Sequence, residues 1–305
     1  MISGGSVCRH RRGGIRSGAM NTRESDRDSR RVIHVAHSPD SDDAFMFYGL
    51  ASGAVDTAEL RFEHELQGIQ ELNERAMRGE LEVTAVSIHA YAYLTDRYIL
   101  LPHGASMGEG YGPRLVSRES MDRDVIRSCT IAVPGELTSA YLALKLWEPA
   151  ARTVVMSFDT ILEAVRDGEV DVGLIIHEGQ LTYADAGLVL LEDLGRWWKE
   201  ETGLPLPLGG NVIRRDLGAE LIPRISDYLR RSIAFSLDHR EQAMDYAMGF
   251  ARGLERQTAD DFVGMYVNSR TLDYGPDGRE AVRLFLERGV AAGLVPGPVE
   301  VEFAD

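Results

Sequence analysis

Short apolar runs rich in branched residues alternate with longer amphipathic segments from residue 32 onward. This alternation is typical of βαβ units built around a mainly parallel sheet. Amphipathic segments at 40–51 and 70–79 are expected to be helices between such strands. The expected strands of this first series cover residues 32–37, 60–66, 83–87, 98–102 and 112–118.

A second series of the same kind runs from residue 129 to about residue 193, which indicates a second α/β lobe. After an expected loop at 202–210 comes a strand at 211–215 and then three helical segments that have no sheet of their own. We expect these helices to pack on the first lobe. The helical segments cover residues 221–237, 240–254 and 278–293.

This order takes the chain across the lobe boundary twice, near 112–118 and again near 205–213. Two crossings form a hinge, and a hinge between two α/β lobes leaves a cleft in which ligands are usually held. The pattern therefore predicts an α/β protein that resembles the two-lobed type II periplasmic binding protein fold. The expected parts are a disordered basic tail at 1–31, a discontinuous lobe 1 at 32–115 plus 213–305, and lobe 2 at 116–212.

Charge is unevenly distributed along the chain. Residues 1–31 carry eight Arg and three acidic residues, and since the whole chain has a formal net charge of -15, the remainder carries -20. A body this acidic lacks the basic face that binding to phosphate backbones requires, so we expect no nucleic-acid partner. The sequence leaves the oligomeric state open.

The start of the chain has no apolar run of the length that a secretory signal requires, and no apolar run anywhere is long enough to span a membrane. Met20 is an alternative start to Met1. Only Cys8 and Cys129 are present, which argues against a disulfide framework and fits a reducing compartment. We therefore expect a cytoplasmic protein. No zinc, P-loop or EF-hand spacing occurs, so we expect neither a metal nor a cofactor.

His177 stands directly after the apolar run VGLII, at the carboxyl end of an expected parallel strand. Ligands bind at this edge of open α/β sheets, and an imidazole there can accept a proton near neutral pH. The alternative is a structural histidine hydrogen-bonded to a loop.

Three further sites carry hydroxyls at the ends of expected strands or the start of an expected helix. Thr138 and Ser139 stand where a loop becomes a helix, a place that suits a carboxylate ligand but also an ordinary helix N-cap. Ser38 follows the first strand and is expected to face the cleft, while Ser87 ends the strand at 83–87. The three carboxylates that follow Ser38 would repel an anionic ligand, and the alternative for this segment is helix capping with a solvated acidic first turn.

Several longer blocks resemble the 1,4-dihydroxy-6-naphthoate synthase family of the futalosine route to menaquinone. The resemblance covers roughly residues 32–290, and GLIIHE followed by TY is among its most specific parts. The blocks are SPDSDDAFMFYGL, LNERAMRGELEVTAVSIHAYAYLTDRY, AVPGELTSAYLAL, GEVDVGLIIHEGQLTY and LGRWWKEETGLPLPLGG.

The resemblance implies a lyase that converts cyclic de-hypoxanthine futalosine to 1,4-dihydroxy-6-naphthoate and releases the sugar-derived fragment without a metal or redox cofactor. It implies that His177 is the proton acceptor. The implied substrate-binding residues are Ala85, Val86, Ser87, Thr138 and Ser139, with Ser38 added from its position alone.

The chain departs from the family pattern in two places. Asp40, Ser41 and Asp42 replace the usual Cys, Pro and Asn, and Ala85 stands where some members carry Lys. Two other functions stay open: a sibling enzyme of the chorismate dehydratase type, and a non-catalytic carboxylate-binding protein. The IIHE block and the LPLPLG segment argue against the sibling enzyme, and a binding protein that serves transport would need export.

Overall fold

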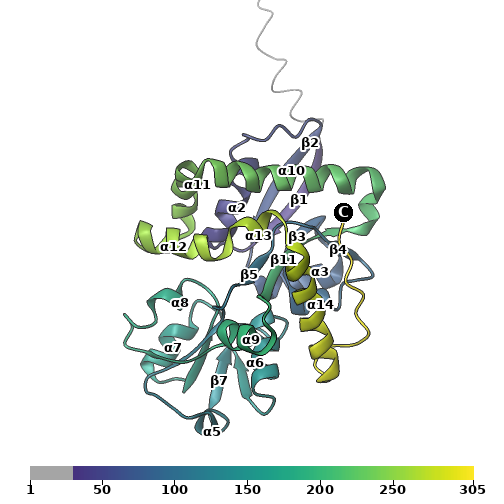
Figure 1. Ribbon diagram of the computed structural model, residues 1–305. Coiled ribbons are helices and arrows are strands. Elements are labelled where there is room, and N and C mark those ends of the chain that lie inside the picture. The colour runs from purple at the N-terminus through teal and green to yellow at the C-terminus, as the bar shows by residue number, and fades with distance from the viewer. Residues whose placement is uncertain (1–29) are drawn as a thin grey trace, which may run out of the picture.

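The computed structural model describes residues 30–305, so the basic tail expected at 1–31 lies outside the described residues except for its last two. Two sheets, each with its own helices, form two lobes (Figure 1). We call the lobe with the larger sheet lobe 1 and the other lobe 2. Figure 1 shows lobe 1 in the upper half, with α10 lying across it, and lobe 2 below.

The sheet of lobe 1 has the strand order β2-β1-β3-β11-β4, and β5 also pairs with β11. Strand β1 runs parallel to β2 and β3, whereas β11 is antiparallel to its neighbours. Every residue of β3 is buried, which places the core of lobe 1 around this strand. The strands are β1 Arg31–His37, β2 Leu60–Leu66, β3 Val83–Ser87, β4 Tyr98–Leu100, β5 Ser106–Gly108 and β11 Leu206–Arg214.

The sheet of lobe 2 has the order β10-β6-β9-β7-β8. Strand β7 is parallel to β8 and β9, and β6 is antiparallel to β9 and β10. Both sheets are therefore mixed, where the sequence predicted mainly parallel pairing. The strands are β6 Arg114–Ser117, β7 Thr130–Val133, β8 Arg152–Val155, β9 Val172–Ile175 and β10 Val189–Asp193.

Helices cover both sheets, and the closest helix packing joins α2 to α10. A Cβ placed on Gly49 of α2 would lie 2.8 Å from the Cα of Ser232 in α10, so glycine allows the two backbones to approach. The helices of lobe 1 are α2 Ser41–Ala51, α3 Ile69–Arg78, α4 Ile88–Tyr91, α10 Gly218–Asp238, α11 Arg240–Ala247, α12 Arg256–Tyr266, α13 Ser269–Leu272 and α14 Gly275–Ala291. Those of lobe 2 are α5 Arg123–Ile126, α6 Ser139–Trp147, α7 Ile161–Asp167, α8 Gly179–Thr182 and α9 Leu194–Thr202.

The chain passes from the first sheet to the second between Gly108 and Arg114, and it returns between Asp193 and Leu206. The two connections touch each other, because a Cβ on Gly195 would collide with the carbonyl oxygen of Tyr111. A larger residue at 195 would push the two connections apart. The hinge is thus a close backbone contact rather than a pair of independent linkers.

One expected loop is a strand. Residues 202–210 were expected to form a loop, yet β11 begins at Leu206 and pairs Gly210 with Val86 of β3. The glycine is required there, since a Cβ on Gly210 would collide with the hydroxyl of Tyr274. Pairing with a buried central strand therefore overrides the local preference of the segment. The return to lobe 1 consequently precedes residue 206.

Candidate functional site

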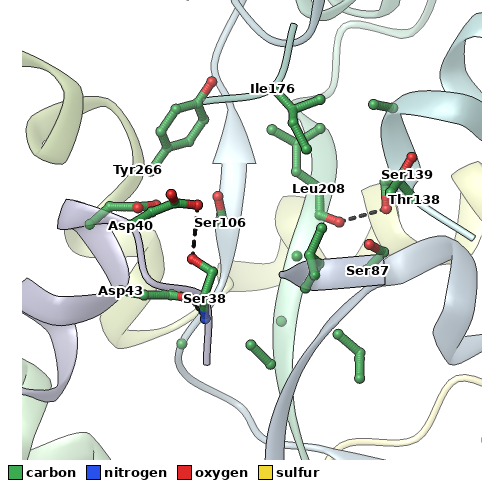
Figure 2. Close-up of a pocket in the computed structure, with 18 of the residues that line it drawn as sticks. Ser38, Asp40, Asp43, Ser87, Ser106, Thr138, Ser139, Ile176, Leu208 and Tyr266 are labelled. Atoms are coloured by element: carbon green, nitrogen blue, oxygen red, sulfur yellow. Dashed lines mark hydrogen bonds between the residues drawn. The ribbon is translucent and has the colours of Figure 1, made fainter. Parts of the chain in front are cut away.

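A cavity of about 800 Å³, part of it open to solvent, lies between the lobes. Its walls come from the strand ends of lobe 1 on one side and from the start of α6 and the end of β9 on the other (Figure 2). Six of the residues singled out from the sequence line it: Ser38, Ala85, Val86, Ser87, Thr138 and Ser139.

The lobe 1 wall is acidic at the start of α2. The backbone N–H of Ser38 donates to Oδ2 of Asp43 at 2.8 Å, and the Ser38 hydroxyl donates to Oδ2 of Asp40 at 2.9 Å. Figure 2 shows the Asp40 and Asp43 side chains beside Ser38 at the cavity. Asp42, which lies between these two residues in the sequence, also lines the cavity.

Burial controls the protonation of this acidic wall. Burial, with a smaller contribution from Asp40, raises the pKa of Asp43 to about 6, against the opposing hydrogen bonds from Ser38. Burial raises the pKa of Asp42 well above its ordinary value, and the neighbouring carboxylates of Asp43, Asp40 and Glu178 raise it further. The wall can therefore accept hydrogen bonds from ligand hydroxyls and also hold protons near neutral pH.

The lobe 2 wall is the start of α6, where both hydroxyls already have protein partners. Thr138 Oγ1 donates to the carbonyl oxygen of Gly135 at 2.7 Å and accepts from the backbone N–H of Tyr141 at 3.2 Å, which is an N-cap bond. Ser139 Oγ donates to the Leu208 carbonyl at 2.5 Å, the bond drawn in Figure 2, and accepts from the backbone N–H of His89 at 3.2 Å.

Two backbone N–H groups at the same helix start are free to donate hydrogen bonds to a ligand. Among the described residues, the N–H groups of Ser139 and Ala140 find no acceptor, and both residues line the cavity. Unpaired N–H groups and the helix dipole together favour a bound anion at this end of a helix. The donors for an anion are thus the amides rather than the two hydroxyls.

The end of β3 is held by Asn73 of α3. Its Nδ2 donates to Ser87 Oγ at 3.1 Å, and its Oδ1 accepts from the backbone N–H of Ser87 at 2.9 Å. Asn73 is fully buried, so this pair of bonds fixes the strand end against the cavity. Ala85 and Val86 of the same strand also line the cavity.

His177 lies two residues beyond β9, at the strand end expected from the sequence, and is 9% exposed. Its Nε2 lies 2.7 Å from the Phe158 carbonyl oxygen, and its Nδ1 accepts from the backbone N–H of Gly179 at 3.1 Å. These partners assign the hydrogen of a neutral ring to Nε2. The cavity wall contains Ile176 and Gln180, on either side of His177 in sequence, but not the imidazole itself.

Sequence reasoning missed a contact that joins the two lobes. Tyr266 Oη donates to Gln180 Oε1 at 2.7 Å, and burial raises the pKa of this phenol above its ordinary value. Tyr266 ends α12, a helix that was not expected. The signal was present, because Ala259, Phe262, Val263 and Tyr266 follow the i, i+3, i+4, i+7 spacing of a buried helix face.

Metal ligands do not gather at this site. Within residues 30–305, His, Cys, Asp and Glu form no group of three or more with a geometry that could hold a metal ion. Nor does any helix in that part of the chain combine the length and hydropathy needed to cross a lipid bilayer.

The two lobes and the cavity between them define a periplasmic-binding-protein-like fold. The alkanesulfonate-binding protein SsuA from Xanthomonas axonopodis, bound to MOPS, matches with a TM-score of 0.65 at 13% identity, over 90% of this chain and 97% of that one. A ligand-binding component of an ABC-type import system from Staphylococcus aureus matches with a TM-score of 0.64 at 13% identity, over 89% and 97%. The predicted fold class is confirmed.

Sequence similarity is much higher to a biosynthetic family. The family model described as "Menaquinone biosynthesis" matches residues 33–291. A 1,4-dihydroxy-6-naphthoate synthase from Streptomyces coelicolor is 41% identical over 90% of this chain and 99% of its own length, and one from Thermus thermophilus is 42% identical over 86% and 96%. A crystal structure of an Archaeoglobus fulgidus protein, 47% identical, matches with a TM-score of 0.83 over 87% of this chain and 98% of that one. The chain therefore belongs to the menaquinone biosynthesis family, as the sequence blocks predicted.

Proposed function

We propose that the protein is a 1,4-dihydroxy-6-naphthoate synthase, a lyase of menaquinone biosynthesis that acts on cyclic de-hypoxanthine futalosine. The observation that carries this proposal is identity of 41% and 42% to two such synthases along nearly their whole length. The cavity between the lobes supports it, because it offers anion-binding amides on one wall and carboxyl groups on the other.

In this proposal the substrate carboxylate binds at the start of α6. The N–H groups of Ser139 and Ala140 donate to it, while Thr138 and the Ser139 hydroxyl shape the helix start that presents them. The backbone at Ala85–Ser87 supports the ring system from the β3 side. The hydroxyls of the sugar-derived part face the acidic wall and donate to its carboxyl groups.

His177 is the proposed general base. Donation of its Nε2–H to the Phe158 carbonyl leaves Nδ1 as the basic nitrogen, and the bond from Gly179 occupies that lone pair in the present arrangement. Because the imidazole does not line the cavity in this arrangement, catalysis requires Nδ1 to turn toward the substrate and to exchange the Gly179 N–H for a substrate proton. Removal of that proton leaves an electron pair that expels the sugar-derived fragment as the ring opens, His177 keeps the proton, and aromatisation of the bicyclic product drives the reaction. Lobe closure contributes by excluding water and fixing the base close to its proton.

The test incubates the purified protein with cyclic de-hypoxanthine futalosine and detects 1,4-dihydroxy-6-naphthoate by mass spectrometry. The wild type is expected to form it, and His177→Asn is expected to lower kcat by roughly 10²- to 10⁴-fold, the usual contribution of a general base. His239→Asn is the matched control, since His239 is an exposed residue between α10 and α11 that does not line the cavity.

The outcomes separate the two parts of the proposal. Absence of product from the wild type would refute the function, and a carboxylate that binds without turnover would identify a binding protein instead. Near-normal turnover by His177→Asn would refute the role of the base and leave the function standing.

A cytoplasmic location belongs to the same proposal. It is supported by the biosynthetic relatives and by Cys129, which has no disulfide partner among the described residues. Cell fractionation tests it: the protein should follow cytoplasmic markers, and enrichment in the secreted or membrane fraction would contradict this location.

A further inference from the structure

Arg252 has an unusual backbone conformation. Its φ is +50°, in the left-handed region that side-chain-bearing residues rarely adopt. Such conformations persist only where the surroundings impose them, and they cluster at functional sites. The residue lies in the segment between α11 and α12 of lobe 1, close to the cavity wall.

The guanidinium of Arg252 contacts both lobes. Within lobe 1 it donates to Oδ1 of Asp40 at 2.5 Å, and across the cleft it donates to Oε2 of Glu178 at 3.1 Å. It also lies 4.9 Å from the ring centroid of Phe158, another residue of lobe 2. The planar fork of an arginine can serve two carboxylates and an aromatic face at once.

Both lobe 2 residues held by Arg252 lie beside His177, one at each ring nitrogen. The Phe158 carbonyl accepts from Nε2 of His177 at 2.7 Å, and the Phe158 and His177 rings make an edge contact with centroids 5.2 Å apart. Glu178 follows His177 in sequence, and its Oε2 lies 3.8 Å from Nδ1. One side chain from lobe 1 therefore contacts the residue that accepts the Nε2–H bond and the carboxylate that lies nearest to Nδ1.

We propose that Arg252 is a positioning residue that orients His177 when the lobes close. This inference rests on the proposed function, because it gives His177 a reaction to perform. When the lobes separate, Arg252 leaves with lobe 1, while Phe158, His177 and Glu178 remain together in lobe 2. The loops that carry them are then free to move relative to each other.

A second contact supports the same coupling. Ser41, the first residue of α2, donates its hydroxyl to Oε1 of Glu178 at 3.2 Å, so both oxygens of this buried carboxylate are held by lobe 1. Asp40, the residue before Ser41, anchors Arg252 on its own side. The start of α2 thus lines the cavity and also closes onto the segment that carries His177.

The experiment compares the wild type with Arg252→Asn and Arg252→Lys. Asparagine tolerates the left-handed conformation, so this variant removes the guanidinium with little backbone cost. Lysine keeps the charge but not the fork. We expect Arg252→Asn to lower kcat roughly 10- to 100-fold with KM changed by no more than about twofold, and Arg252→Lys to recover part of the loss. Arg215→Gln is the control, because this arginine has a similar exposure and binds Glu302 away from the cleft.

The deciding measurement is the NMR signal of the imidazole N–H of His177, which would not change if Arg252 had a merely structural role. In ¹⁵N-histidine-labelled protein saturated with 1,4-dihydroxy-6-naphthoate, the Nε2–H that donates to Phe158 should give a slowly exchanging signal, assigned by its loss in His177→Asn. Arg252→Asn should broaden or lose that signal while the other histidine signals stay.

An unchanged Nε2–H signal and kcat in Arg252→Asn would overturn the inference. So would a general loss of all histidine signals in both Arg252 variants, because it would assign Arg252 to the fold rather than to His177. If the wild type forms no naphthoate, the proposed function fails on its own, and the N–H signal, recorded with and without the naphthoate, still decides whether Arg252 orients the ring.

Discussion

Replacing Asp43 with Asn should change how stability depends on pH. Burial raises the pKa of this carboxyl from 3.8 to about 6, so the folded state binds its proton more tightly than the unfolded state does. Stability then falls as the pH rises through this interval, because the carboxylate must be charged in a buried position. Asparagine has nearly the same shape, and its oxygen can still accept from the Ser38 N–H.

The size of the effect follows from the shift. A difference of about two units corresponds to about 3 kcal/mol of stability that the wild type loses between acid pH and pH 8. Roughly 1.4 kcal/mol of this loss falls between pH 5 and pH 8, because the unfolded carboxyl is already mostly ionised at pH 5.

Urea unfolding at pH 5, 6.5 and 8 measures the effect. The free energy of unfolding of Asp43→Asn relative to wild type should rise steadily over this range, and Asp96→Asn, at an exposed surface carboxylate, should show no such trend. If the Asp43→Asn and wild-type values stay parallel across the three pH values, the buried-carboxyl argument is refuted.

Two further substitutions test the packing and the closed arrangement. Gly49→Ala should destabilise the protein by about 1–3 kcal/mol, because the added Cβ meets the backbone of Ser232. Gly249→Ala is the control and should be nearly neutral, because the space around Gly249 is open. Thermal unfolding compares the two variants, and equal melting temperatures would contradict the packing argument. Tyr266→Phe leaves Gln180 Oε1 without its donor and should weaken the binding of 1,4-dihydroxy-6-naphthoate by about 1 kcal/mol or more. Calorimetry measures this affinity. An unchanged affinity would show that the hydrogen bond between Tyr266 and Gln180 does not stabilise the closed form.

The local hydrophobic pattern was sufficient to predict the strands and the helix start that line the cavity. The branched apolar runs located β1 and β3, and therefore Ser38 and Ser87 at their ends. The change from loop to helix located the start of α6 at Ser139. These features are predictable because a buried strand and a capped helix start each leave their signal within a few consecutive residues.

Long-range contacts could not be predicted in this way. Arg252 and Glu178 lie 74 positions apart, and nothing near either residue indicates the other. The same holds for Tyr266 and Gln180, which lie 86 positions apart. The sequence also could not show that the hydroxyl of Ser139 is used within the protein, because its partners Leu208 and His89 belong to lobe 1.

For a carboxylated ligand the two walls of the cavity are not equivalent. A carboxylate at the start of α6 meets unpaired N–H groups, whereas the reverse orientation places it against the carboxyl groups of Asp40, Asp42 and Asp43. The reverse orientation would require these carboxyl groups to stay protonated, because carboxylates in a partly buried site repel each other, so electrostatics favours the first orientation. That orientation turns the non-acidic end of the ligand toward the start of α2, whose first residue, Ser41, also binds Glu178 beside His177. Closing the lobes therefore fixes the direction of the ligand and the position of the proposed base through the same few residues.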